Sequence, residues 1–249
     1  MSDSNAILPS TGNSEIFGRT LSPFVVRTWQ AHETAFREQH GYSPGQTEFE
    51  HFFHDGKPRF RNADFPERHR KWLDLWIRGK VTSCNPTWDL YLEKILASIC
   101  GPGIIIALLG KRGTGKTQLA TALGWHVCHA GQNAAYKWAQ SLPRQIQATY
   151  ADGAKLTEDE VLDRLVRVQL LIVEEVSVTS GSDFGTRILS EIICRRHDKG
   201  RDTILISVQS EEDFAQSVGE SITDRIAEGG GIYTFNWPSF RRSAPRPAP

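Results

Sequence analysis

The sequence has few cysteines, no surplus of charge and no long apolar run, and each of these features excludes a class of protein. Its four cysteines form no Cys-x-x-Cys pair, which argues against a zinc site or a disulfide framework and fits reduced thiols. No stretch approaches the ~20 apolar residues that a membrane helix needs. The N-terminus lacks the basic start and apolar core of a secretory signal. We therefore expect a cytoplasmic protein that has no membrane partner.

Charge is balanced over the whole chain but not along it. Lys plus Arg and Asp plus Glu number 29 each among 249 residues, so the net charge indicates no partner. Residues 1–50 carry three Arg and no Lys against six carboxylates, whereas residues 51–80 carry eight Lys or Arg against four carboxylates. Aromatic residues interleave with the basic ones in this second segment. Such a pattern is typical either of single-stranded DNA binding or of an amphipathic helix whose Trp72 and Trp76 pack on a core.

The apolar pattern predicts an α/β domain. Short apolar runs alternate with helical stretches, which is typical of a parallel five-stranded sheet flanked by helices. The expected strands are 104–109, 134–139, 170–173, 203–208 and 231–235. We expect a disordered tail at 1–22, a small, mostly helical N-terminal region at 23–87, the α/β domain at 88–241 and a second disordered tail at 242–249.

A phosphate-binding loop follows the first of these strands. The segment Gly110-Lys-Arg-Gly-Thr-Gly-Lys-Thr117 matches G-x-x-x-x-G-K-[ST] and directly precedes a predicted helix. Its glycines, Gly110, Gly113 and Gly115, let the backbone turn so that N–H groups face phosphate oxygens. Lys116 is expected to neutralise the β- and γ-phosphates, and Thr117 to offer its hydroxyl to Mg²⁺. Thr114 and Gln118 complete the residues that we expect to contact ATP.

Two adjacent carboxylates end the strand at 170–173. In a parallel sheet they lie at the carboxyl edge, where ligands bind in doubly wound folds. We expect Glu174 to hold the magnesium ion and Glu175 to polarise the attacking water as general base. The alternative is a solvated strand end. Most P-loop enzymes carry Asp at the first position, so the longer Glu174 makes rapid turnover less certain than binding.

Two arginines near the C-terminus are further candidates. Arg225, in Ser221-Ile-Thr-Asp-Arg-Ile226, could reach a γ-phosphate bound to a neighbouring subunit, as an arginine finger does. Arg241, in the segment FNWPSFR, is a candidate for contacting the nucleotide of its own subunit. Spacing alone favours a plain surface role for Arg225.

Residues 103–241 resemble the AAA+ ATPases of the DnaC/IstB-like group, which includes replicative helicase loaders and transposition ATPases. The segments ILSEIICRRHDKGRDT, GESITDRI and FNWPSFR carry the resemblance in order and spacing, and KPRFRNADF is similar to a segment often found upstream. The resemblance implies an AAA+ P-loop fold without a C-terminal helical lid. It also implies that Arg225 is the arginine finger and that Arg241 is the second nucleotide sensor.

One position departs from the family pattern. The fourth strand usually ends with Asn as the first sensor, and here Val208 stands at that place. Gln209 or Ser207 could substitute for it, but the departure puts rapid hydrolysis in doubt.

The resemblance implies an ATP-dependent loader that delivers a replicative ring helicase onto single-stranded DNA. It also implies ATP-dependent self-association. Residues 1–80 are the expected helicase contact, because the bare ATPase core lacks this segment. The alternatives are a transposition helper ATPase of the same group and a nucleotide-gated binding module with little turnover.

Overall fold

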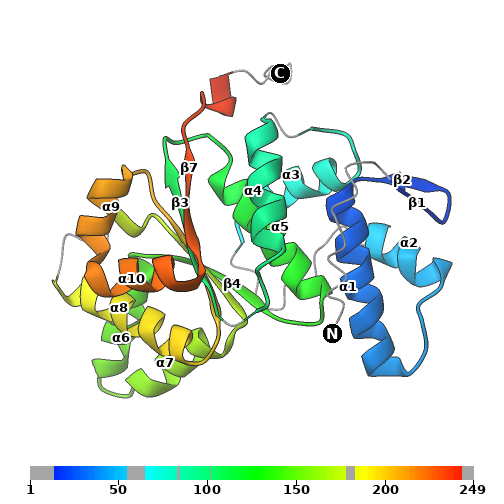
Figure 1. Ribbon diagram of the computed structural model, residues 1–249. Helices are drawn as coiled ribbons and strands as arrows, with labels where there is room; N and C mark the ends of the chain where they lie inside the picture. The colour runs from blue at the N-terminus through cyan, green and yellow to red at the C-terminus, as the bar shows by residue number, and fades with distance from the viewer. Residues whose placement is uncertain (1–13, 55–64, 83–84, 102, 178–182, 243–249) are drawn as a thin grey trace, which may run out of the picture.

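A five-stranded parallel sheet forms the centre of the protein (Figure 1). The computed structural model describes residues 14–54, 65–82, 85–101, 103–177 and 183–242. The strand order is β4-β5-β6-β3-β7, and all four neighbouring pairs are parallel. The strands are β3 (Ile105–Gly110), β4 (Ala134–Trp138), β5 (Leu170–Glu174), β6 (Asp202–Ile206) and β7 (Gly231–Phe235). The predicted sheet is therefore confirmed, with strand ends shifted by one or two residues.

Helices precede the sheet and connect its strands. Those before the sheet are α1 (Pro23–His40), α2 (Gln46–His54), α3 (Glu67–Ile77) and α4 (Pro86–Leu96). Those that follow are α5 (Lys116–His129), α6 (Ser141–Gln147), α7 (Glu158–Arg167), α8 (Asp183–Asp198), α9 (Glu211–Val218) and α10 (Glu220–Gly229). Short 3-10 turns lie at η1 (Ala148–Tyr150) and η3 (Phe240–Arg242). Among the described residues, no helix is long and apolar enough to cross a membrane.

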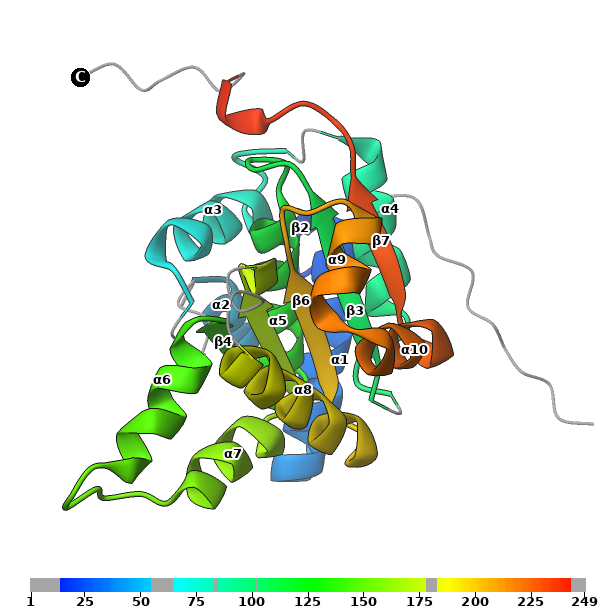
Figure 2. The ribbon, with the colours of Figure 1, turned by 90° about the vertical axis from the view of Figure 1, so that its left-hand side faces the viewer.

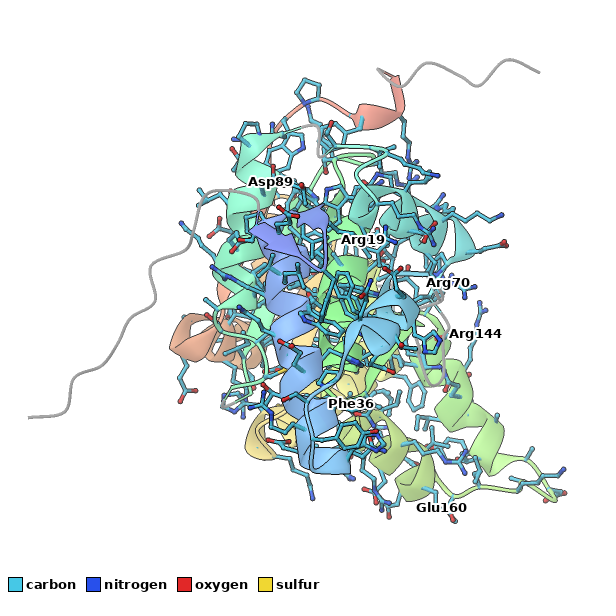
Figure 3. The ribbon with its side chains drawn as sticks, turned by 90° about the vertical axis from the view of Figure 1, so that its right-hand side faces the viewer. Arg19, Phe36, Arg70, Asp89, Arg144 and Glu160 are labelled. Atoms are coloured by element: carbon cyan, nitrogen blue, oxygen red, sulfur yellow. The ribbon has the colours of Figure 1, made fainter. Side chains whose placement is uncertain are left out.

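The sheet separates two hydrophobic cores because successive strand residues point to opposite faces. Ile106 and Leu108 of β3 join the core under α1–α5, whereas Ile105, Ala107 and Leu109 join the core under α6–α10. Figure 1 shows the two helical layers on either side of the sheet. Figure 2 shows α6 and α7 extending away from the body of the protein, and Figure 3 places Arg144 and Glu160 on this pair of helices.

The N-terminal region shares the core of the α/β domain. Phe24, Trp29 and Leu73, from α1 and α3, are almost fully buried in the same cluster as Ile106 of β3. Phe65 packs where a Cβ on Gly124 of α5 would lie, since its ring atom is 2.7 Å from that position. Residues 23–54 and 65–77 therefore form one body with the sheet.

The end of the predicted N-terminal tail is ordered, which corrects the boundary at residue 22. Residues 14–21 form a hairpin of β1 (Ser14–Ile16) and β2 (Arg19–Leu21). Leu21 is 3% exposed, and Arg19 pairs with Glu50 of α2 at 2.7 Å. These two long-range contacts hold a segment that is too polar to be recognised as structured from its sequence. Residues 1–13 and 243–249 of the two predicted tails lie outside the described residues.

The tryptophans of the basic aromatic segment pack on the core, as the second alternative predicted. Trp72 and Trp76 stack with ring centroids 5.6 Å apart, and both meet the buried Trp88 of α4 edge-on. Phe52 and Phe65 are also buried. The neighbouring residues 55–64, which include further basic residues, lie outside the described part of the chain.

A buried arginine joins the amino-terminal ends of β5 and β6. Arg196 of α8 is 0% exposed and donates to the carbonyl oxygens of Leu165, Val168 and Asp202. Burial lowers the pKa of this guanidinium to about 9, so it remains charged at neutral pH. The Asp202 carboxylate is also fully buried and accepts from the backbone N–H groups of Cys100 and Ile104. This polar cluster fixes where two central strands begin.

We expect Arg196→Met to destabilise the protein strongly, because it leaves several buried carbonyl groups without a donor and removes the positive charge near the buried Asp202 carboxylate. Losing one partner of a buried ionic cluster costs about 3–5 kcal/mol. The neighbouring Arg195 is the matched control, since its side chain is 40% exposed and pairs with Glu191. Arg195→Met should cost less than about 1 kcal/mol. Urea denaturation of both variants measures the two free energies of unfolding, and equal losses would contradict this role for Arg196.

Candidate nucleotide-binding site

The carboxyl ends of the central strands and the start of α5 open onto a cavity of about 1070 Å³. Pockets for small molecules commonly measure about 300–1,000 Å³. The cavity is therefore large enough for a complete nucleoside triphosphate. Its walls include the phosphate loop, the end of β5, the residues after β6, the segment after β7 and part of α3.

The phosphate loop has the backbone conformation that its glycines predict. Gly110, Gly113 and Gly115 all have positive φ, at 123°, 83° and 95°. A Cβ at Gly113 would also overlap the Ser239 side chain. The side chain of Lys116 folds back over the loop, and its Nζ donates to the carbonyl oxygens of Gly110 (2.5 Å) and Lys111 (2.8 Å). Burial lowers the pKa of Lys116 to about 8, although Glu174 opposes the shift.

Other parts of the chain hold the outer carbonyl groups of the loop. Trp88 Nε1 donates to Gly115 O and Trp237 Nε1 donates to Thr114 O, each at 3.0 Å. The backbone N–H of Phe240 donates to Gly113 O at 2.8 Å. Sequence reasoning missed these contacts, although Trp237 and Phe240 lie in the FNWPSFR segment that it singled out.

Glu174 and Thr117 form an oxygen-rich pair that fits Mg²⁺. Thr117 Oγ1 lies 3.1 and 3.0 Å from the two carboxylate oxygens of Glu174. Burial raises the pKa of Glu174, while hydrogen bonds from Thr117 and Tyr136 act against the rise. Mg²⁺ prefers such hard oxygen ligands, and usually completes its shell with water and substrate phosphates. Among the described residues there is no cluster of three or more His, Cys, Asp or Glu that could hold a metal ion without water or phosphate ligands.

Glu175 has a different environment from Glu174. Its φ of 57° is unusual for a residue with a side chain, and its Oε1 lies 3.6 Å from Arg112 Nη2. Both carboxylates line the cavity, as the sequence predicted for the end of this strand. The left-handed backbone turns the chain at Glu175, so the two neighbouring carboxylates have separate surroundings.

The structure brings most of the predicted nucleotide contacts together. Those that line the cavity are Gly113, Gly115, Lys116, Thr117, Gln118, Glu174, Glu175 and Arg241. Gly110 and Thr114 do not line it. Thr114 is 0% exposed and its Oγ1 donates to Lys111 O at 2.9 Å, so this side chain shapes the loop and does not face the cavity.

The position after β6 that the resemblance predicts as the first sensor is occupied by a buried serine and a half-exposed valine. Ser207 is 1% exposed, Val208 is 39% exposed, and both line the cavity. The Ser207 hydroxyl donates to Gln209 Oε1 at 2.9 Å, and Gln209 itself is not part of the cavity wall. Of the two substitutes that the sequence suggested, only Ser207 is placed at the cavity.

The two candidate arginines lie in different places. Arg241 lines the cavity beside the phosphate loop, with its Cγ 3.2 Å from where a Cβ on Gly113 would lie. Arg225 lies on α10 and is not part of the cavity wall. Its Nη1 donates to the carbonyl oxygen and the hydroxyl of Ser221, at 2.8 and 2.7 Å. Arg225 therefore does not contact the nucleotide site of its own subunit in this conformation.

Known proteins are similar to this domain in sequence and in fold. The replicative helicase loader DnaC of Buchnera aphidicola subsp. Baizongia pistaciae is 31% identical over 134 residues, which are 53% of this chain and 54% of that protein. The DnaC of Escherichia coli K12 is 28% identical over 133 residues, again 53% and 54% of the two chains. The chain thus spans about half the length of the curated relatives it matches.

Solved structures confirm the AAA+ P-loop fold. A crystal structure of the DnaC helicase loader has a TM-score of 0.56 at 19% identity, covering 68% of this chain and 99% of that one. AMPPCP-bound DnaA from Aquifex aeolicus has a TM-score of 0.54 at 22% identity, covering 70% and 51%. The protein family described as "IstB-like ATP binding protein" matches residues 103–243 of this chain. The matched residues include the phosphate loop, both carboxylates and both arginines. Because this match takes in more than half of the sequence, the chain belongs to the IstB-like family of ATP-binding proteins.

Proposed function

We propose that the protein is a cytoplasmic, ATP-dependent loader that delivers a replicative ring helicase onto single-stranded DNA. The observation that carries this proposal is one cavity that combines Lys116, the Thr117–Glu174 pair and Glu175. Relatives named as replicative helicase loaders support the choice of partner. We propose the N-terminal region as the helicase contact. Because α1–α3 share a core with α5, which follows the phosphate loop, a change at the nucleotide site would be transmitted to this region.

The residues of the cavity can perform ATP hydrolysis. Thr117 and Glu174 would hold Mg²⁺, which neutralises phosphate charge when bound. Lys116 would exchange its bonds to Gly110 O and Lys111 O for bonds to phosphate oxygens. Glu175 would accept a proton from the attacking water as that water displaces ADP from the γ-phosphorus. Arg225 would supply positive charge to the site of a neighbouring subunit, which requires ATP-dependent self-association.

A nucleotide-gated binding module with little turnover is the second candidate. The ion pair between Arg112 and Glu175 supports this second function, because the pair engages the carboxylate that is proposed as the general base. The apolar Val208 at the sensor position supports it as well. Measuring ATP affinity and kcat on the same sample separates the two functions. Assembly on double-stranded DNA with a transposase, in place of helicase loading, would instead favour a transposition helper.

We expect Lys116→Ala to abolish nucleotide-dependent helicase loading and to weaken ATP binding by about 10-fold or more, since hydrogen bonds to charged groups contribute roughly 1.5–3 kcal/mol. Lys111→Ala is the matched control, because Lys111 lies in the same loop but is not part of the cavity wall. Loading is measured as helicase retained on circular single-stranded DNA with and without ATP. Wild-type binding, hydrolysis and loading by Lys116→Ala would contradict the assignment of this loop.

We expect Glu175→Gln to retain ATP binding and to lose turnover by about 10²–10⁴-fold, because an amide keeps the shape of the side chain but cannot accept a proton. Glu174→Gln should instead weaken magnesium-dependent binding, since Glu174 is paired with Thr117. Steady-state ATPase rates and a binding titration measure the two effects. Normal turnover in Glu175→Gln together with lost turnover in Glu174→Gln would reverse the two roles.

We expect Arg225→Ala to fold and bind ATP like the wild type, because Arg225 lies outside the cavity of its own subunit. Hydrolysis should fall, by up to the ~10³–10⁵-fold typical of arginine fingers, only where subunits assemble on DNA or helicase. Mixing Arg225→Ala with Lys116→Ala should restore part of the ATPase activity, since one intact interface then forms between the two variants. No recovery in a mixture that demonstrably co-assembles would rule out a finger acting between subunits.

A further inference from the structure

One wall of the nucleotide cavity comes from outside the matched domain. Arg68, His69 and Trp72 of α3 line the cavity, and all three precede residue 103, where the family match begins. Figures 1 and 2 place α3 at the end of the sheet from which β7 continues into η3. The spacing i, i+1, i+4 puts the three residues on one side of the helix.

The adjoining face of α3 is anchored in the core. Leu73 is 1% exposed, and Phe65, two residues before the helix, is 2% exposed. The Phe65 ring occupies the space that a side chain on Gly124 of α5 would fill. Since α5 begins with Lys116, the helix that carries the phosphate-binding lysine also fixes the position of α3.

Trp72 is connected to the phosphate loop through one other ring. Its ring stacks on Trp76 and meets Trp88 at a centroid distance of 5.7 Å and an angle of 75°. Trp88 in turn donates its indole N–H to Gly115 O. Trp72 is only partly buried, and the part that these neighbours leave uncovered lines the cavity. An aromatic surface thus lies beside the loop where the phosphates of a nucleotide would bind.

His69 adds a hydrogen-bond donor to the same wall. Arg68 Nε donates to His69 Nε2 at 3.0 Å, so Nε2 carries no proton and the neutral ring bears its proton on Nδ1. Burial, with the charges of Arg68 and Arg241, lowers the pKa of His69 to about 4. The imidazole is therefore neutral at physiological pH and offers one N–H.

From this geometry we infer that α3 is the nucleoside side of the ATP site, where Trp72 contacts the base and His69 Nδ1–H donates to the nucleoside. This inference rests on the proposed ATP binding at the phosphate loop. The ligand class is a nucleoside triphosphate whose phosphates are held by the matched domain and whose base is held by the N-terminal region. Contact between a base and an aromatic side chain typically contributes enough affinity for about a 5- to 150-fold effect.

Comparing the binding of ATP with that of inorganic tripolyphosphate distinguishes the contribution of this wall to affinity from that of the phosphate loop. Calorimetric titrations with Mg²⁺ should show that Trp72→Leu weakens ATP binding about 10-fold or more and changes tripolyphosphate binding less than twofold. His69→Ala should act in the same direction with a smaller effect. Lys71→Ala is the matched control on the same helix, because Lys71 is exposed and pairs with Glu67, and it should change neither ligand. An equal effect of Trp72→Leu on the two ligands, or no effect on either, would overturn the inference.

A second readout covers the case in which Trp72→Leu does not fold. Trp72→Phe keeps a ring packed against Trp76 and Trp88 but removes one indole. ATP should change the tryptophan emission of the wild type more than tripolyphosphate does, because Trp88 and Trp237 contact the loop that both ligands share, and Trp72→Phe should remove most of this difference. An unaltered ATP signal in Trp72→Phe would also overturn the inference. A wild type that binds neither ligand would instead contradict the proposed function itself.

Discussion

The hydrogen bonds that hold the carbonyl groups of the phosphate loop are the constraint on which the site depends. Carbonyl groups that faced inward would repel phosphate, so the loop binds anions only if its carbonyl oxygens stay turned away from them. In this conformation those of Gly110 and Lys111 accept from Lys116, which would exchange these bonds for bonds to phosphate oxygens. Those of Gly113, Thr114 and Gly115 accept from the C-terminal segment and from α4. The glycines make the turn possible, and these donors select it.

The same contacts link segments that are far apart in the chain. The segment after β7 reaches the loop through Trp237 and Phe240, and α4 reaches it through Trp88. The Trp88 ring also packs edge-on against Trp72 and Trp76 of α3. Binding free energies are reciprocally linked, so a partner held by the N-terminal region would change ATP affinity by the same factor as ATP changes the affinity for that partner. The N-terminal helices would thereby provide a means of coupling between ATP and such a partner.

The sequence was sufficient for the features that depend on local pattern. The five strands, the loop and the paired Glu174 and Glu175 follow from apolar runs and motif spacing, because a buried parallel strand must be apolar along its length. The hairpin at 14–21 was missed, since its order depends on the contact between Arg19 and Glu50. The position of Trp72 at the cavity was missed as well, because its helical spacing with Trp76 indicates packing and does not say what lies beside the exposed edge.

The central claim is that ATP at this loop controls binding to a replicative helicase, and co-purification tests it most directly. The full chain and the ring helicase encoded in the same genome would be mixed with ATP, with ADP or without nucleotide, and the complex would be measured by size-exclusion chromatography. The account predicts a stable complex with ATP that weakens with ADP. A complex that forms equally under all three conditions, or no complex under any of them, would contradict it.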